Sequence, residues 1–175
     1  MRGRAALFVL CILLTGCAGD RSVERTISTP ADPQRAAMNA LIAFARAPSD
    51  GRWDAVPFAA IVDLGLGDSL RTQRSARELR NPGAWLLTLD LFRARAGMTS
   101  ALELIAAEQG RLRVTEGPHP HCVSAPVPPP QEVADLDRVV VQPRDPDGCL
   151  DWWTVDAFVN GDGEIEAVTL DLWEP

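Results

Sequence analysis

The sequence lacks several features that would show what the protein acts on. It has no lysine, and its 17 basic residues are outnumbered by 24 acidic ones, which gives a formal net charge of −7. The arginines form no basic patch, which argues against binding to nucleic acid or, through charge, to an anionic membrane surface. No segment after residue 16 contains the roughly 18 consecutive apolar residues expected of a membrane span. These absences leave a small acidic domain without an obvious partner.

Motifs for catalysis and cofactor binding are also missing. Gly65 and Gly67 are followed by Leu70, where a dinucleotide-binding fingerprint needs its third glycine. No serine lies in a Gly-x-Ser-x-Gly nucleophile elbow. The sequence therefore predicts no cofactor and assigns no catalytic residue.

Possible metal ligands occur in three short strings. His119 and His121 would point the same way in an extended segment that leads into Cys122, but no second cluster offers further ligands. The acidic strings 145–148 and 160–163 resemble fragments of calcium loops without matching the twelve-residue pattern. Turn formation explains both strings, so the sequence predicts no metal site, although weak cation binding stays an alternative.

The amino terminus has the parts of a bacterial lipoprotein signal. Arg2 and Arg4 precede an apolar run over 5–14, which is too short to span a bilayer, and the run ends in the lipobox Leu14-Thr15-Gly16-Cys17. This pattern predicts cleavage after residue 16 and a diacylglyceryl group on Cys17, whose two acyl chains would hold the protein to a membrane. An ordinary secretory signal with an accidental cysteine is the alternative.

The mature chain divides into a tether and one domain. Residues 17–31 are polar without a hydrophobic period and predict a flexible tether, and 32–175 have the size of a single domain. The remaining cysteines, Cys122 and Cys149, would face an oxidising compartment, which predicts a disulfide between them. Free thiols or metal binding are the alternatives.

Helices are predicted in the first half of the domain. Asp32-Pro33 is a typical helix start, and the apolar spacing that follows predicts a helix over 33–47. Capping boxes predict a short helix beginning at Ser75 and a longer one over 100–108.

Strand patterns occur between and after these helices. Alternation over 60–72, with a turn at Gly67-Asp68, predicts a β-hairpin, although a helix over 55–64 competes. Residues 85–92 could form a strand. Two further short strands are predicted at 112–114 and 139–141, separated by a polyproline-type excursion at 125–130.

The chain should end in a second hairpin, formed by 150–159 and 164–173 around the turn 160–163. Helices first and strands last predict an α+β fold, with N-terminal helices packed on a C-terminal antiparallel sheet. Alternation assigns one face of the hairpin to the core. That face contains Trp153, Val155, Ala157, Val159, Val168, Leu170 and Leu172.

The opposite face of this hairpin is the candidate binding face: Trp152, Asp156, Asp171 and Trp173. The predicted register places Asp156 opposite Ala167 and Asp171 opposite Trp152, with Ile165 on the same face. Exposed tryptophans beside carboxylates can stack on a sugar or anchor a partner. Alternatively, helices cover this face and bury both tryptophans, or the carboxylates are simply solvated.

Three strings resemble one family. His119–Cys122, Cys149–Asp156 and Val168–Pro175 are similar to segments of uncharacterised secreted proteins of actinobacteria, the high-GC Gram-positive bacteria. The resemblance implies neither an activity nor catalytic residues. The order of elements is also loosely similar to nuclear transport factor 2 and cystatin-like folds, which says nothing of function.

These observations predict a membrane-anchored lipoprotein of the cell envelope. It would sit on the extracytoplasmic face of the cell membrane and bind a small ligand or an envelope protein without catalysis. Alternative functions are a small hydrolase acting on an envelope substrate and a structural envelope lipoprotein.

Overall fold

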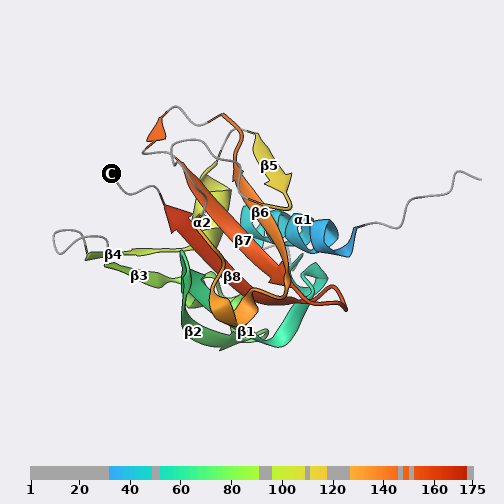
Figure 1. The fold of residues 1–175 in the computed structure, drawn as a ribbon. Helices are drawn as coiled ribbons and strands as arrows, with labels where there is room; N and C mark the ends of the chain where they lie inside the picture. Colours follow the sequence, from blue (N-terminus) through green and yellow to red (C-terminus); the bar gives the residue numbers. More distant parts are fainter. Residues whose placement is uncertain are drawn as a thin grey trace, which may run out of the picture.

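The domain is built on one six-stranded sheet with two helices, as the computed structural model shows (Figure 1). The structure describes residues 32–48, 52–90, 96–108, 111–117, 127–145, 148–149 and 152–172. The strand order is β2-β1-β8-β7-β6-β5, and a separate pair, β3-β4, stands beside the sheet. The α+β prediction is therefore confirmed. No helix in these ranges is both long and apolar enough to cross a membrane.

Helix α1 (Pro33–Arg46) forms where the sequence predicts it. The Asp32 carboxylate accepts hydrogen bonds from the backbone N–H groups of Gln34 and Arg35, at 3.1 and 3.3 Å, and caps the first turn. One side of the helix is buried against the sheet. Its buried residues are Ala37, Met38, Leu41, Phe44 and Ala45.

Strands β1 (Phe58–Leu66) and β2 (Ser69–Ser75) form the predicted first hairpin. Gly67 occupies the turn with a φ of +54°, a left-handed conformation that glycine adopts without steric cost. The competing helix over 55–64 is wrong, since only a 3-10 turn, η2 (Arg52–Ala55), precedes β1. Strand propensity prevails there because the residues that follow alternate between the core and the opposite face.

The last four strands form an antiparallel meander: β5 (Leu112–Thr115), β6 (Asp137–Pro143), β7 (Trp153–Val159) and β8 (Ile165–Leu172). The predicted core face of β7 and β8 is correct, but the register is shifted by two residues. Asp156 pairs with Thr169 and Asp171 with Thr154. A bulge after Phe158 also sets Ile165 opposite Val159 and turns it into the core, which corrects its predicted face.

One pairing changes the sheet from antiparallel to mixed. β8 lies between β7 and β1, and it runs parallel to β1, with Leu64 beside Val168 and Leu66 beside Leu170. The C-terminal strands β5 to β8 are antiparallel as predicted, and the parallel pairing with β1 makes the complete sheet mixed. Local sequence patterns reveal hairpins, whereas nothing local marks a pairing between strands about a hundred residues apart.

The helical elements in the middle of the chain are shorter than the sequence predicts. A capping box forms at Ser75, whose backbone N–H donates to the Glu78 carboxylate at 2.7 Å, but only the 3-10 turn η3 (Glu78–Arg80) follows. A second 3-10 turn, η4 (Pro82–Trp85), leads into β3 (Leu87–Asp90), which pairs with β4 (Ala96–Thr99). Helix α2 (Ala101–Ala107) is as predicted, although Ser100 makes no capping bond through its side chain.

Different segments pack on the two faces of the sheet. α1 and α2 lie on one side, behind the sheet in Figure 1, and the segment around the 3-10 turn η5 (Gln131–Val133) crosses in front. Val133 packs with Phe158 and Ala167 in a small cluster that is separate from the main core. The sheet therefore has no fully open face at β7.

Candidate functional site

Half of the predicted binding face is inside the protein. Trp152 is 2% exposed and Asp156 is 3% exposed, so neither offers a contact surface. The segment around η5 covers the side of β7 and β8 that carries Asp156, because Val133 and Leu136 pack there with Phe158 and Ala167. The prediction of an exposed face is therefore corrected for these two residues. Trp173 lies outside the described residues.

Asp156 is held by an ion pair across the sheet. Arg138 on β6 donates to Asp156 Oδ2 from Nε, at 2.9 Å, and from Nη2, and its Nη1 donates to the backbone carbonyl of Val127 at 3.2 Å. Burial raises the pKa of Asp156 from its ordinary value, while the charge and hydrogen bonds of Arg138 oppose this rise. The arginine thus ties β7 to the segment that covers it.

The remaining member of the predicted face, Asp171, lies elsewhere. It is partly exposed near the end of β8 and lines a cavity of about 760 Å³. Asp156 and Asp171 share a face of the sheet, but Asp156 is engaged with Arg138 while Asp171 borders the cavity. The structure therefore does not bring them together as a pair of carboxylates in one open site.

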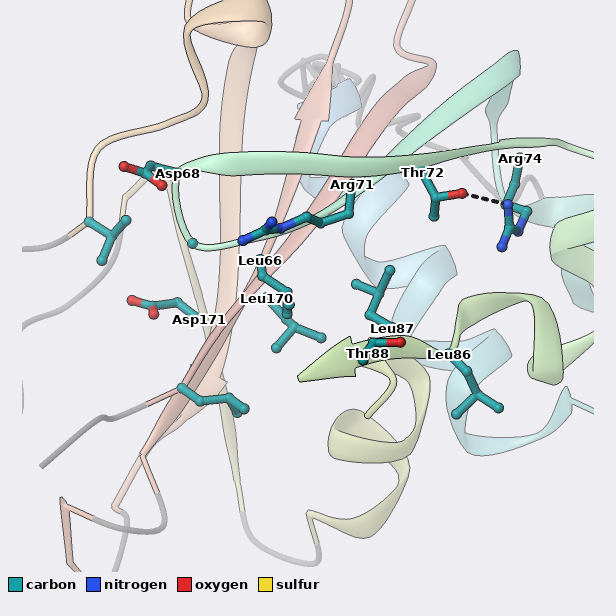
Figure 2. Close-up of a pocket in the computed structure, with 13 residues that line it drawn as sticks. Leu66, Asp68, Arg71, Thr72, Arg74, Leu86, Leu87, Thr88, Leu170 and Asp171 are labelled. Carbon is teal, nitrogen blue, oxygen red and sulfur yellow. Dashed lines mark hydrogen bonds between the residues drawn. The ribbon is translucent and has the colours of Figure 1, made fainter. Parts of the chain in front are cut away.

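The cavity forms where β8 extends beyond β1. The last residues paired between these strands are Leu66 and Leu170, and the Gly67 N–H donates to the Leu170 carbonyl at 2.8 Å. Beyond this point β1 turns away into β2, whereas β8 continues for two more residues. The start of β3 closes the opposite side (Figure 2). The cavity is thus a consequence of the parallel pairing.

The described lining of the cavity is aliphatic and polar, without an aromatic ring. Five leucines and a valine contribute its apolar part: Leu66, Leu86, Leu87, Leu170, Leu172 and Val127. Its polar side chains are Asp68, Arg71, Thr72, Arg74, Thr88 and Asp171. A cavity of this size lies in the range of small-molecule sites, and its lining combines apolar and polar side chains in equal number.

Arg74 is fixed in the wall of the cavity. Its Nη1 donates to Thr72 Oγ1 at 2.6 Å and to the Gln73 carbonyl at 2.8 Å, and its Nε donates to the Ala84 carbonyl at 3.3 Å. Thr72 and Arg74 share a face of β2 because strand side chains alternate. Sequence analysis missed both residues, although alternation in β2 could have placed them together.

The other predicted sites fall largely outside the described residues. Cys17, His119, His121 and Cys122 are among them. Cys149 is disulfide-bonded, and its pairing with Cys122 stays a prediction.

The acidic strings are turns where the structure describes them. In the string 160–163, the Asn160 side-chain oxygen accepts from the backbone N–H groups of Asp162 and Glu164, each at 3.0 Å. These bonds close the turn between β7 and β8, which is the structural role that the sequence suggested.

Comparisons of the chain with known protein families, with curated proteins and with solved structures found no match.

Proposed function

We propose that this protein is a lipid-anchored, extracytoplasmic lipoprotein whose domain binds a small ligand in the cavity at the end of β8. The cavity carries the proposal, because its volume of about 760 Å³ lies within the range of roughly 300 to 1,000 Å³ that is common for ligand sites. Its leucine-rich lining would gain from displacing water, and its polar side chains would orient a ligand. We propose the cavity as the binding site in place of the predicted face, because Trp152 and Asp156 of that face are buried.

The proposed location rests on the amino-terminal sequence. The short apolar run and the lipobox ending in Cys17 are the features of a lipoprotein signal. A Cys17→Ala variant should lose the acyl modification, measured by intact mass, and leave the membrane fraction. A wild-type protein with an unmodified residue 17, recovered in soluble form, would contradict the anchor.

Ligand binding can be tested by filling the cavity. Thr88 is exposed and borders it, so Thr88→Trp should occupy part of the space without removing a core contact. Ile61→Trp is the matched control, because Ile61 is 52% exposed on β1 and lies outside the lining. We expect amphipathic small molecules to raise the melting temperature of the wild type and of Ile61→Trp, but not of Thr88→Trp.

Two outcomes would contradict binding at this place. One is a ligand that stabilises Thr88→Trp as strongly as the wild type, which would put the site elsewhere. The other is a screen of acidic, basic and neutral amphiphiles in which none stabilises the wild type.

A further inference from the structure

The charge of Arg74 bears on the chemistry of the ligand. Its three acceptors, Thr72 Oγ1 and the carbonyls of Gln73 and Ala84, are all uncharged. Within the described part of the chain, no carboxylate lies within 4.0 Å of this guanidinium and its Nη2 has no acceptor, although its charge reaches Glu78 and helps to lower the pKa of that carboxyl group. A positive group is therefore held rigidly at the cavity with donors left for a ligand. Guanidinium groups bind carboxylates and phosphates through such donors.

The apolar side chains of the cavity bear on the chemistry of the uncharged part of the ligand. Leu66, Leu170 and Leu172 belong to the ends of β1 and β8, and Leu86 and Leu87 come from the segment that enters β3. Among the described lining residues none is aromatic, so these residues offer no ring face on which a sugar or a nucleobase could stack. The leucine side chains of the cavity would instead pack against an aliphatic chain of the ligand.

The charges also set an orientation. Figure 2 shows Asp68, Asp171 and the guanidinium end of Arg71 on one side of the cavity, with Thr72 and Arg74 on the other side. A ligand with an acidic group at Arg74 would extend its other end toward a region that contains charges of both signs.

We propose that the cavity binds an amphipathic anion with one carboxylate or phosphate group at Arg74 and an aliphatic chain against the leucines. This inference rests on the proposed function and specifies its ligand class. The Arg74 Nη2 group donates to the acid, and the Thr72 hydroxyl, which already accepts from Arg74, donates its own hydrogen to the same group. Arg71 also lines the cavity, but its guanidinium reaches toward the end with Asp68 and Asp171 rather than toward Arg74 (Figure 2).

A series of ligands that differ only at their ends tests the inference with the wild-type mature protein. Dodecanoate and dodecyl phosphate carry one acidic group, dodecanol carries none, and dodecyltrimethylammonium is cationic. We expect the two monoacids to bind about tenfold or more tightly than dodecanol, measured by calorimetry below micelle concentrations.

Variants of the protein test whether Arg74 causes the preference for acidic ligands. Arg74→Gln should weaken dodecanoate binding by about tenfold while leaving dodecanol within about twofold. Arg77→Gln is the matched control, since it removes the same charge from an exposed position outside the lining. Melting temperatures establish that each variant is folded.

The outcomes separate this inference from the proposed function. Equal binding of dodecanol and dodecanoate, or an Arg74→Gln variant that keeps the preference for acids, would overturn the anion inference and leave a ligand site. Failure of every amphiphile would overturn both. Uptake of labelled phosphatidylglycerol from vesicles, compared with uptake of free dodecanoate, distinguishes a membrane lipid from a free acid as the source of the same chemistry.

Discussion

Arg138 and Asp156 form an ion pair between β6 and β7, underneath the segment that carries η5. Asp156 Oδ2 accepts hydrogen bonds from both Nε and Nη2 of Arg138. Asp156 Oδ1 is buried without a hydrogen-bond partner among the described residues. Such a pair contributes little net stability but is costly to break, because removal of one member leaves the other buried and uncompensated.

A double-mutant cycle should show this asymmetry. We expect Arg138→Met to lower the free energy of unfolding by about 3 to 5 kcal/mol, and the double variant with Asp156→Leu to regain most of that loss. Chemical denaturation measures both. Arg113→Met on β5, which removes an arginine outside this pair, should cost less than about 1 kcal/mol. Additive losses in the cycle would show that the two residues act independently.

The same pair predicts a dependence on pH. Burial raises the pKa of Asp156, so this group contributes stability that is fully present below its ordinary pKa of 3.8 and is lost as the pH rises through the folded-state pKa. Without Arg138 the effect of burial is no longer opposed, and the pKa rises further. The difference in unfolding free energy between wild type and Arg138→Met should therefore grow between about pH 4 and pH 7. A constant difference would contradict the raised pKa.

Two glycines beside the cavity should respond differently to alanine. A Cβ at Gly65 would lie 2.5 Å from the Ser69 carbonyl oxygen and 2.9 Å from Thr169 Cγ2, so the backbone itself must move. A Cβ at Gly67 would lie 3.7 Å from its nearest neighbour, Val127 Cγ1, so it would fit without a clash. Alanine there would instead be strained by the left-handed φ, which should lower the free energy of unfolding by about 1 to 2 kcal/mol. Gly65→Ala should therefore destabilise the protein more than Gly67→Ala, as measured by urea denaturation. Gly67→Asn is the control, since asparagine tolerates this conformation, and it should lose less than Gly67→Ala.

The predicted disulfide can be tested in the mature protein. A bridge between Cys122 and Cys149 should stabilise the domain by roughly 3 to 4 kcal/mol, because it restricts the unfolded chain. The variant with serine at both positions should show that loss, and a reducing agent should then have no further effect on it. Intact mass and thiol titration of the wild type provide the independent readout. Two reactive thiols in the oxidised protein would contradict the bridge.

Local signals explain what could be predicted of the fold. Asp32-Pro33, the turn at Gly67 and the alternation in β7 are short-range features, and each produced the expected element. The even spacing of strand side chains kept the core face of the last hairpin correct despite its two-residue shift, since a shift of two preserves the face.

The candidate site could not be predicted because it depends on long-range pairing. Asp171 was identified for its neighbours in sequence, yet it borders the cavity because β8 extends past Leu66. Arg74 gave no signal of its own among 17 basic residues. The burial of Asp156 depends on how the segment around η5 folds back, which the prolines before it do not specify.

The parallel pairing of β1 with β8 also bears on how the chain folds. The two strands are about a hundred residues apart, so the sheet stays in two parts until the last strand inserts between β1 and β7. Pairings over such separations slow folding, and until β8 arrives one edge of β1 is left without its partner strand and is open to aggregation. A nascent chain that lacks Ile165–Leu172 would therefore expose this edge of β1, and refolding of the complete chain should be limited by docking of the final strand.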